Sequence, residues 1–299
     1  MTPRFRGILP PMVTPFTPDE ELDEEALRRE TRVMLAAGVH GFCVCGSTGE
    51  GHVLSVEESC RVTTIVREEV AGRVPVIAGI IRDSTREVIR YGLALRDAGA
   101  DALQITPVHY LFTPTEAGMI DYYRRIGEAV GLPILIYNVI PWNTISPDLL
   151  LRLSEVEQVV GVKQSGGDIH KLADLLKLNR GRLQIFSAVD DLLYPSFMLG
   201  AEGAIAAILT VLPELSVQLW DACQAGRYDE ARSIHERLLP VWRAINAPDM
   251  SARTKACCQL QGRAVGEARH PILPVSAQVR ATIAAALEEA GVLQGVAAD

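Results

Sequence analysis

Residues 159–167 read VVGVKQSGG, an apolar and β-branched run that carries one lysine and ends in a glycine-containing turn. A run of this length between turn residues predicts a buried strand from Val159 to Gln164. Because an ammonium group buried without a partner is costly, burial favours the neutral amine, which is nucleophilic. The other lysines of the chain lie in polar or helical surroundings, at Lys171, Lys177 and Lys255. Lys163 is therefore the first candidate for a reactive residue.

Seven further runs of this kind repeat along the chain, separated by amphipathic helical stretches. The eight predicted strands span residues 7–13, 41–45, 74–80, 102–106, 133–139, 159–164, 183–187 and 203–209. The helices between them are predicted over residues 23–37, 55–71, 84–98, 114–130, 146–155, 169–178 and 192–199. Apolar strands on this rhythm need cover on both faces, as in parallel sheets, and eight βα units close into a (β/α)8 TIM barrel.

An open doubly wound sheet is the alternative fold, but it would require a G-x-G-x-x-G motif after the first strand, and none occurs there. Helices are also predicted after the last strand, over residues 213–225, 229–246, 251–260 and 277–289. We expect an α/β barrel core at residues 1–212. A closing helix and a C-terminal helical bundle at residues 213–299 would pack on it as one structural unit.

Composition restricts the class of protein. The chain has 299 residues, of which 48% are hydrophobic and 22% charged, which is ample for a large soluble core. A formal net charge of -8 without a basic run argues against nucleic acid or an anionic membrane as a partner. Prolines interrupt the N-terminal residues, so no secretory signal is expected, and the apolar run at residues 204–212 is too short to span a bilayer. We expect a cytoplasmic protein.

The cysteines predict buried free thiols, because disulfides are rare in cytosolic chains of this size. Cys43 and Cys45 are separated by one residue, so strand alternation should point both thiols to one face. No second cluster has metal-ligand spacing, and no group of histidines and carboxylates at strand ends offers three ligands. A metal site is therefore not expected.

Active sites of (β/α)8 barrels lie at the carboxyl ends of the strands, where Ser47, Thr48, Tyr137 and Lys163 are predicted. Neighbouring strands lie about 4.8 Å apart, so the Tyr137 phenol and the Lys163 amine could meet. A neutral amine adds to a ketone to give a Schiff base, which stabilises an adjacent carbanion. The phenol could shuttle protons, and the hydroxyls of Ser47 and Thr48 could hold a carboxylate. The alternative is a snorkelling lysine beside a core tyrosine.

The motifs stand in the order of one known family. They are Thr14-Pro15-Phe16, Gly46-Ser47-Thr48-Gly49-Glu50, Tyr137-Asn138-Val139 and Gly161-Val162-Lys163. The chain resembles, over essentially its whole length, the dihydrodipicolinate synthase and N-acetylneuraminate lyase family of class I aldolases. The resemblance implies that Lys163 forms the imine with pyruvate or another 2-oxo acid and that Tyr137 shuttles protons.

The same resemblance extends to the substrate pocket and the assembly. It implies that Gly46, Ser47 and Thr48 bind the substrate, and that Ser47 with Thr48 holds its carboxylate and completes the proton relay with Tyr137. It also implies that Ile205 forms an apolar wall next to the bound ketone. It implies no metal and no organic cofactor, since the imine is covalent. The resemblance also implies assembly as a dimer of tight dimers, so a homotetramer or homodimer is expected.

Two segments depart from the family pattern. In the synthase an arginine after the tyrosine motif binds the carboxylate of the second substrate, but here residues 140–144 read IPWNT. Trp142 and Asn143 would form a pocket that stacks and hydrogen-bonds, which does not replace a bidentate ion pair. The paired tyrosines of the family are altered to His109 and Tyr110, either of which could reach a neighbouring subunit's site or simply be a surface aromatic of a loop.

These features predict a lyase that cleaves or forms an aldol bond, or dehydrates a hydroxylated 2-oxo acid of the 2-keto-3-deoxy sugar acid type, through an imine on Lys163. One alternative is a 4-hydroxy-tetrahydrodipicolinate (dihydrodipicolinate) synthase of lysine biosynthesis, with an arginine from elsewhere binding the second carboxylate. The other is a non-catalytic barrel that binds a 2-oxo acid as a sensor.

Overall fold

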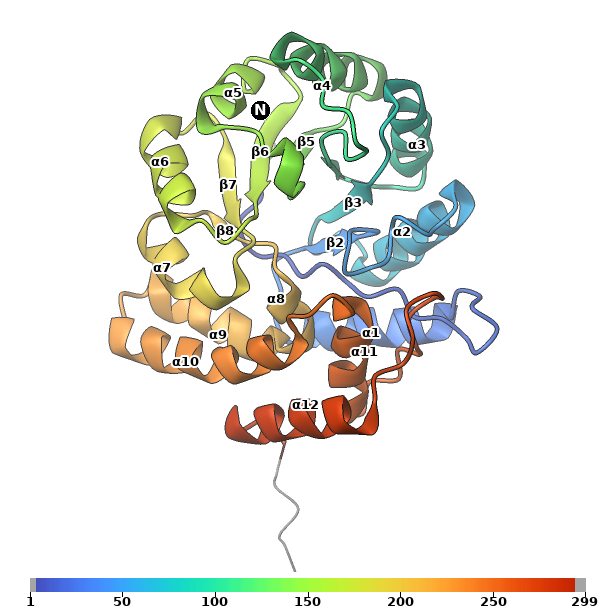
Figure 1. Ribbon diagram of the computed structural model, residues 1–299, viewed down its shortest axis with the longest axis vertical. Coiled ribbons are helices and arrows are strands. Elements are labelled where there is room, and N and C mark those ends of the chain that lie inside the picture. Colours follow the sequence, from blue (N-terminus) through green and yellow to red (C-terminus); the bar gives the residue numbers. More distant parts are fainter. Residues whose placement is uncertain (1–3, 294–299) are drawn as a thin grey trace, which may run out of the picture.

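The computed structural model describes residues 4–293, and its centre is a sheet of eight parallel strands surrounded by helices (Figure 1). The strands are β1 (Gly7–Ile8), β2 (Phe42–Val44), β3 (Val76–Ile80), β4 (Ala102–Ile105), β5 (Ile134–Asn138), β6 (Val159–Gln164), β7 (Gln184–Ser187) and β8 (Gly203–Ala204). They are hydrogen-bonded in the order β1-β8-β7-β6-β5-β4-β3-β2. A parallel bridge between Pro11 and Cys43 joins the two ends of this order. The predicted (β/α)8 barrel is confirmed.

Helices follow each strand in turn. Those of the barrel are α1 (Glu24–Ala36), α2 (Val56–Val70), α3 (Thr85–Asp97), α4 (Glu116–Val130), α5 (Pro147–Leu153), α6 (Ile169–Asn179), α7 (Leu193–Met198) and α8 (Ala207–Val211). The C-terminal helices are α9 (Pro213–Gln224), α10 (Tyr228–Ile245), α11 (Met250–Leu260) and α12 (Ala277–Glu289). Two 3-10 turns, η1 (Pro141–Asn143) and η2 (Asp190–Leu192), follow β5 and β7.

Helix starts follow from the local sequence. The Ser55 side chain accepts from the backbone N–H of Glu58, and the Glu58 carboxylate accepts from the N–H of Ser55 at 2.8 Å, a reciprocal capping box. Thr115 and Ser146 cap α4 and α5 in the simpler way, with one side-chain oxygen each. The three caps thus set the first residues of α2, α4 and α5, which follow the loops at the carboxyl ends of β2, β4 and β5.

Two predicted strands are much shorter than expected, whereas the others match their predicted bounds to within two residues at either end. The first was expected over residues 7–13, but Pro10 and Pro11 lack the N–H groups that a ladder requires, so β1 ends at Ile8. The eighth was expected over residues 203–209, and its second half is wrong, because Ala207–Val211 forms helix α8. Every residue of α8 is buried, and a short apolar run of this kind does not distinguish a strand from a buried helix by its periodicity.

The barrel interior is a separate apolar cluster beneath the strand ends. It comprises Phe5, Leu9, Cys43, Ile77, Ala102, Leu135, Val160, Phe186 and Ile205. Gly161 lets β6 approach this layer, since a Cβ there would lie 2.6 Å from the carbonyl oxygen of Gln184 and 2.7 Å from Leu135. Tyr137 and Lys163 lie two residues beyond Leu135 and Gly161 on β5 and β6, so their side chains face the same interior.

Helices α9 to α12 form the C-terminal part of the chain and lie together below the barrel in the view of Figure 1. The Arg237 guanidinium on α10 donates to the carbonyl oxygen of Ala290, just after α12, at 2.9 Å. The division into a core at residues 1–212 and an extension at residues 213–299 stays a prediction, and residues 1–3 and 294–299 lie outside the described part. Within residues 4–293, no helix has both the length and the apolar character to cross a membrane.

Candidate active site

Lys163 and Tyr137 are partners in the register of β6 and β5. The Lys163 Nζ lies 3.8 Å from the centroid of the Tyr137 ring. Both side chains are buried, with 4% of Lys163 and 5% of Tyr137 exposed. Lys163 forms no ion pair with any residue of the described range, so nothing there neutralises its ammonium form directly. The amine and the phenol predicted from the strand pattern therefore meet in a buried position at the ends of β5 and β6.

The turn after β2 brings the hydroxyl of Ser47 to this pair. The Tyr137 hydroxyl donates to the Ser47 Oγ at 3.2 Å, which links β5 to a residue far away in sequence. Thr48, the next residue, is 5% exposed and lies in the same turn. Lys163, Tyr137 and Ser47 thus form one contiguous group, with Thr48 beside it.

Backbone geometry fixes the shape of this turn. Cys45 has a φ of +56°, so the chain leaves the strand direction there. The N–H of Gly51 donates to the carbonyl oxygen of Gly46 at 3.0 Å, and a Cβ at Gly51 would lie 1.8 Å from the carbonyl oxygen of Cys45. The Thr14 hydroxyl donates to the carbonyl oxygen of Gly49 at 2.6 Å. Only glycine fits at position 51, so the motif is a steric requirement of the turn.

The thiols near the site are poor nucleophiles. Burial raises the pKa of Cys43 to about 12 and that of Cys45 to about 12, so both stay protonated at neutral pH. The expectation that both thiols share one face is wrong. Cys43 belongs to the barrel interior, whereas Cys45 packs in the outer core and points its Sγ to the carbonyl oxygen of Ser59, because the positive φ at Cys45 ends the strand alternation. All six cysteines are free thiols.

Asp190 lies in η2, directly after β7, and is 6% exposed. Its Oδ1 accepts from the N–H of Ile208 at 2.7 Å, in the first turn of α8. Burial raises the pKa of Asp190 to about 7, although the Ile208 N–H and the charge of Lys163 act in the opposite direction. A buried carboxyl group within electrostatic range of the candidate nucleophile is therefore part of the site's environment.

Ile205 follows β8 and is fully buried in the barrel interior. Its N–H donates to the carbonyl oxygen of Ser187 at 2.9 Å, which continues the ladder between β7 and β8. Phe186, its neighbour in the same cluster, pairs with Lys163 in the β6–β7 register. Ile205 and Phe186 therefore supply the apolar surroundings of the lysine.

The loop after β4 is held by Asp83. The carboxylate lies 2.9 Å from Nδ1 of His109 and also accepts from the backbone N–H groups of His109 and Tyr110. The Asn143 amide donates to the carbonyl oxygen of Val108 at 2.7 Å. Asn143 and His109 thus stabilise the loop: the Asn143 amide contacts the backbone of Val108, and the His109 ring contacts the Asp83 carboxylate.

The aromatic rings on this side of the barrel are exposed. The Trp142 Nε1 donates to the carbonyl oxygen of Tyr110 at 3.3 Å, yet 63% of each of these two side chains is exposed. Leu111 and Phe112, which follow Tyr110, are 74% and 78% exposed. Four large exposed side chains therefore lie on the segments that follow β4 and β5.

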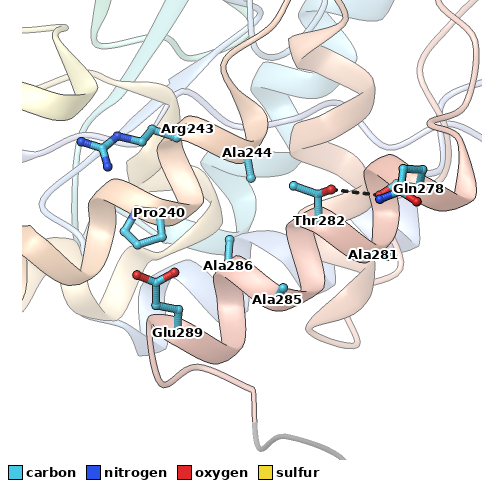
Figure 2. Close-up of a pocket in the computed structure, with 9 residues that line it drawn as sticks. All are labelled: Pro240, Arg243, Ala244, Gln278, Ala281, Thr282, Ala285, Ala286 and Glu289. Carbon is cyan, nitrogen blue, oxygen red and sulfur yellow. Dashed lines mark hydrogen bonds between the residues drawn. The ribbon is translucent and has the colours of Figure 1, made fainter.

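A groove of about 600 Å³ lies elsewhere, between α10 and α12. Figure 2 shows Arg243 and Pro240 on one wall, Ala285 on the other, and Glu289 at one end. None of its lining residues comes from a strand end or touches Lys163, so this groove is not a candidate for the active site. Within the described residues, no group of three histidine, cysteine or carboxylate side chains is arranged to hold a metal.

Comparison with known proteins identifies the family. The model of the dihydrodipicolinate synthetase family matches residues 4–290. The chain belongs to this family. A 4-hydroxy-tetrahydrodipicolinate synthase of Methanothrix thermoacetophila is 35% identical over 296 residues, which cover 97% of this chain and 99% of that protein. A protein of the same description from Phenylobacterium zucineum is 36% identical over 296 residues, with the same coverage.

Solved structures agree with this assignment. YagE, a prophage protein of the dihydrodipicolinic acid synthase family from E. coli K12, was solved in complex with pyruvate. It has a TM-score of 0.92 and 27% identity, and the match covers 97% of this chain and 100% of that one. A dihydrodipicolinate synthase from Acinetobacter baumannii, also complexed with pyruvate, has a TM-score of 0.90 and 28% identity, with the same coverage.

The resemblance to this family is confirmed, and with it the enzyme class. The family comprises lyases that use the Schiff-base mechanism of class I aldolases. The names of the relatives support the synthase alternative better than the aldolase or dehydratase activity that the sequence favours, although both activities belong to this class.

Among the buried charged residues that the sequence analysis missed, two bear on the candidate site. Asp190 stands at the end of β7, where the strand-end rule that selected Lys163 would also have selected it. Lys255 is fully buried in α11, although its neighbours in sequence gave no sign of burial, and it pairs with Glu50. No local pattern reveals the second residue, because its partner lies in a distant part of the chain.

Proposed function

We propose that this protein is a lyase in which Lys163 forms a Schiff base with pyruvate or another 2-oxo acid. The observation that carries the proposal is the group formed by Lys163, Tyr137 and Ser47, with its 3.8 Å and 3.2 Å contacts. The neutral amine adds to the keto carbon, two protons are delivered to the keto oxygen, and that oxygen leaves as water. The resulting imine accepts the electron pair released when a proton or an aldol fragment leaves the adjacent carbon.

Tyr137 is the proton carrier of this scheme. Its hydroxyl is fixed by Ser47, and its ring is adjacent to the amine, so one group can serve both the imine nitrogen and the departing oxygen. The hydroxyls of Ser47 and Thr48 and the backbone amides of the turn after Gly46 bind the substrate carboxylate. Ile205 packs against the apolar part of the substrate.

The distal half of the substrate is a neutral, hydroxylated group. Trp142 occupies the segment in which the synthase places its carboxylate-binding arginine; its single N–H already donates to the carbonyl oxygen of Tyr110, so the indole offers a flat apolar face and no cationic donor. Arg82, which follows β3, donates to the carbonyl oxygens of Ile81 and Leu54 and to the hydroxyl of Tyr91, so its guanidinium is already engaged. Aldol cleavage, aldol condensation or dehydration of a hydroxylated 2-oxo acid fits these groups.

Synthase activity is the second candidate. It is supported by relatives that are 32–36% identical and are described as 4-hydroxy-tetrahydrodipicolinate synthases. An arginine from a neighbouring subunit would then bind the second carboxylate. The exposed surface of Tyr110, Leu111, Phe112 and Trp142 supports association of two copies at this loop, with Tyr110 reaching the partner's site, and a homodimer or homotetramer is proposed accordingly.

The experiment is a panel of hydroxylated 2-oxo acids scored for pyruvate release and for 2-oxo acid dehydration, beside a coupled assay of condensation with aspartate semialdehyde. Turnover of one panel compound well above the condensation rate supports the first candidate, and the reverse order supports the synthase. A 2-oxo acid sensor would show neither activity. Its ligand affinity would also be unchanged in Lys163→Ala, whereas the lyase variant loses borohydride-dependent trapping of pyruvate.

A further inference from the structure

Lys255 is a fully buried cation that the Schiff-base chemistry does not use. Its Nζ lies 2.7 Å from Oε1 of Glu50, donates to the carbonyl oxygen of Glu267 at 2.7 Å, and lies 4.2 Å from the centroid of the Phe16 ring. Burial lowers the pKa of Lys255, and the negative charge of Glu50 opposes that effect. Helix α11 of the C-terminal extension therefore carries an ammonium group whose charged partner belongs to the barrel.

Glu50 is part of the turn that presents Ser47 and Thr48. Its φ is +56°, an uncommon conformation for a residue other than glycine, and its N–H donates to the carbonyl oxygen of Ser47 at 3.1 Å. Its Oε2 accepts from the backbone N–H of Arg269 at 2.9 Å. The two carboxylate oxygens are thus held by two segments of the extension, while the backbone of the same residue shapes the hydroxyl turn.

Among the described residues, no other buried cation forms an ion pair with the Glu50 carboxylate. The guanidinium of Arg269 is turned to the carboxylate of Glu58 and to the carbonyl oxygen of Glu20. Glu267 approaches the pair through its backbone carbonyl oxygen, which accepts from Lys255. Lys255 is therefore the group that neutralises Glu50 in the barrel wall.

We propose that Lys255 is a positioning residue for the carboxylate-binding turn: through Glu50 it holds Ser47 at the distance from Tyr137 that substrate binding and proton transfer require. The inference rests on the proposed function, because it assigns Ser47 and Thr48 to the substrate carboxylate. A buried ion pair is weak evidence for stability as such, and fixing one arrangement of a chain segment is its best supported use. Here the fixed segment is a strained turn at the mouth of the barrel.

The chain contains a second buried ion pair that serves as a control. Arg263, which follows α11, pairs with Glu30 on α1, with 3.0 Å between Nε and Oε2. The exposed fractions are 8% and 2%, close to those of the first pair. This pair also joins the extension to the barrel, but neither partner contacts the turn after β2. Loss of the two pairs should therefore have similar effects on stability and different effects on pyruvate binding.

The test compares the charge-neutral double variants Lys255→Met/Glu50→Gln and Arg263→Met/Glu30→Gln in the full chain. The measurements are the urea midpoint, the pyruvate concentration that gives half-maximal borohydride trapping, and the maximal trapping rate. The first variant should raise the half-saturating pyruvate concentration by about tenfold or more, since a displacement of about 1 Å can cost that much. The control should stay within about twofold of wild type.

Equal half-saturation values in wild type and the first variant, or equal effects of the two variants, would overturn the proposal. If Lys255→Met/Glu50→Gln does not fold, the single variant Glu50→Gln decides, because it keeps the shape of the side chain and an oxygen acceptor for Lys255. Its half-saturating concentration should rise by about threefold or more, and a wild-type value contradicts the inference. Failure of the proposed function is recognised separately, as absence of trapping in the wild-type protein.

Discussion

Substitution of Tyr137 by phenylalanine removes one oxygen atom from the candidate site and leaves the rest in place. The ring is 5% exposed and lies 3.8 Å from the Lys163 Nζ, so phenylalanine preserves both the packing and the contact with the amine. The lost hydrogen bond to Ser47 is a neutral one of 3.2 Å, which is worth about 1 kcal/mol of folding stability. If the hydroxyl carries the protons of imine and enamine formation, its loss costs about 10²- to 10⁴-fold in rate.

The assay is exchange of the pyruvate methyl protons in D2O, followed by NMR, because this exchange reports enamine formation without a second substrate. Tyr123→Phe is the matched control: its hydroxyl also makes one hydrogen bond, to the carbonyl oxygen of Ile105 at 3.2 Å, and its ring is fully buried in the outer core. The control should lose a similar amount of stability and keep the wild-type exchange rate. An exchange rate of Tyr137→Phe within about threefold of wild type would refute the role of the hydroxyl.

Three further predictions concern packing, pH and association. Gly161→Ala should destabilise the fold by about 1–3 kcal/mol in urea unfolding, since its Cβ would lie 2.6 Å from the Gln184 carbonyl oxygen; wild-type stability would contradict this. Burial raises the pKa of Asp190 to about 7, so the folded state keeps a proton that the unfolded chain releases above about pH 4. The free energy of unfolding should then fall by at most about 4 kcal/mol between about pH 4 and pH 7, and Asp190→Asn should remove this component of the pH dependence; identical pH profiles would disprove it. Charged substitution of the exposed Leu111 and Phe112 should shift the protein toward monomer in analytical ultracentrifugation, whereas an unchanged sedimentation coefficient would exclude this surface as an interface.

Much of the fold could be predicted because the barrel repeats one simple pattern. Strand β6 occupies the predicted range Val159–Gln164, and α12 the predicted range Ala277–Glu289. Both are periodic segments between clear stop signals, where local sequence and tertiary burial agree. Helix α8 shows the limit, because periodicity does not distinguish a short buried helix from a strand, whereas the early end of β1 could have been predicted from Pro10 and Pro11.

The candidate site divides in the same way. Lys163 and Tyr137 could be placed together because the register of parallel strands brings their ends to one edge. The contact of Tyr137 with Ser47 was expected only from the family resemblance, and the burial of Lys255 was not expected at all. An ion pair between α11 and the turn after β2 depends on how the extension packs on the barrel, and no local pattern encodes that packing.

The identity of the nucleophile is tested most directly by borohydride reduction in the presence of pyruvate, followed by proteolysis and mass mapping of the adduct. The proposed mechanism predicts a single reduced pyruvyl group, on the peptide that contains Lys163, and none in Lys163→Ala. Absence of an adduct, or an adduct on Lys171, Lys177 or Lys255 in its place, would contradict it.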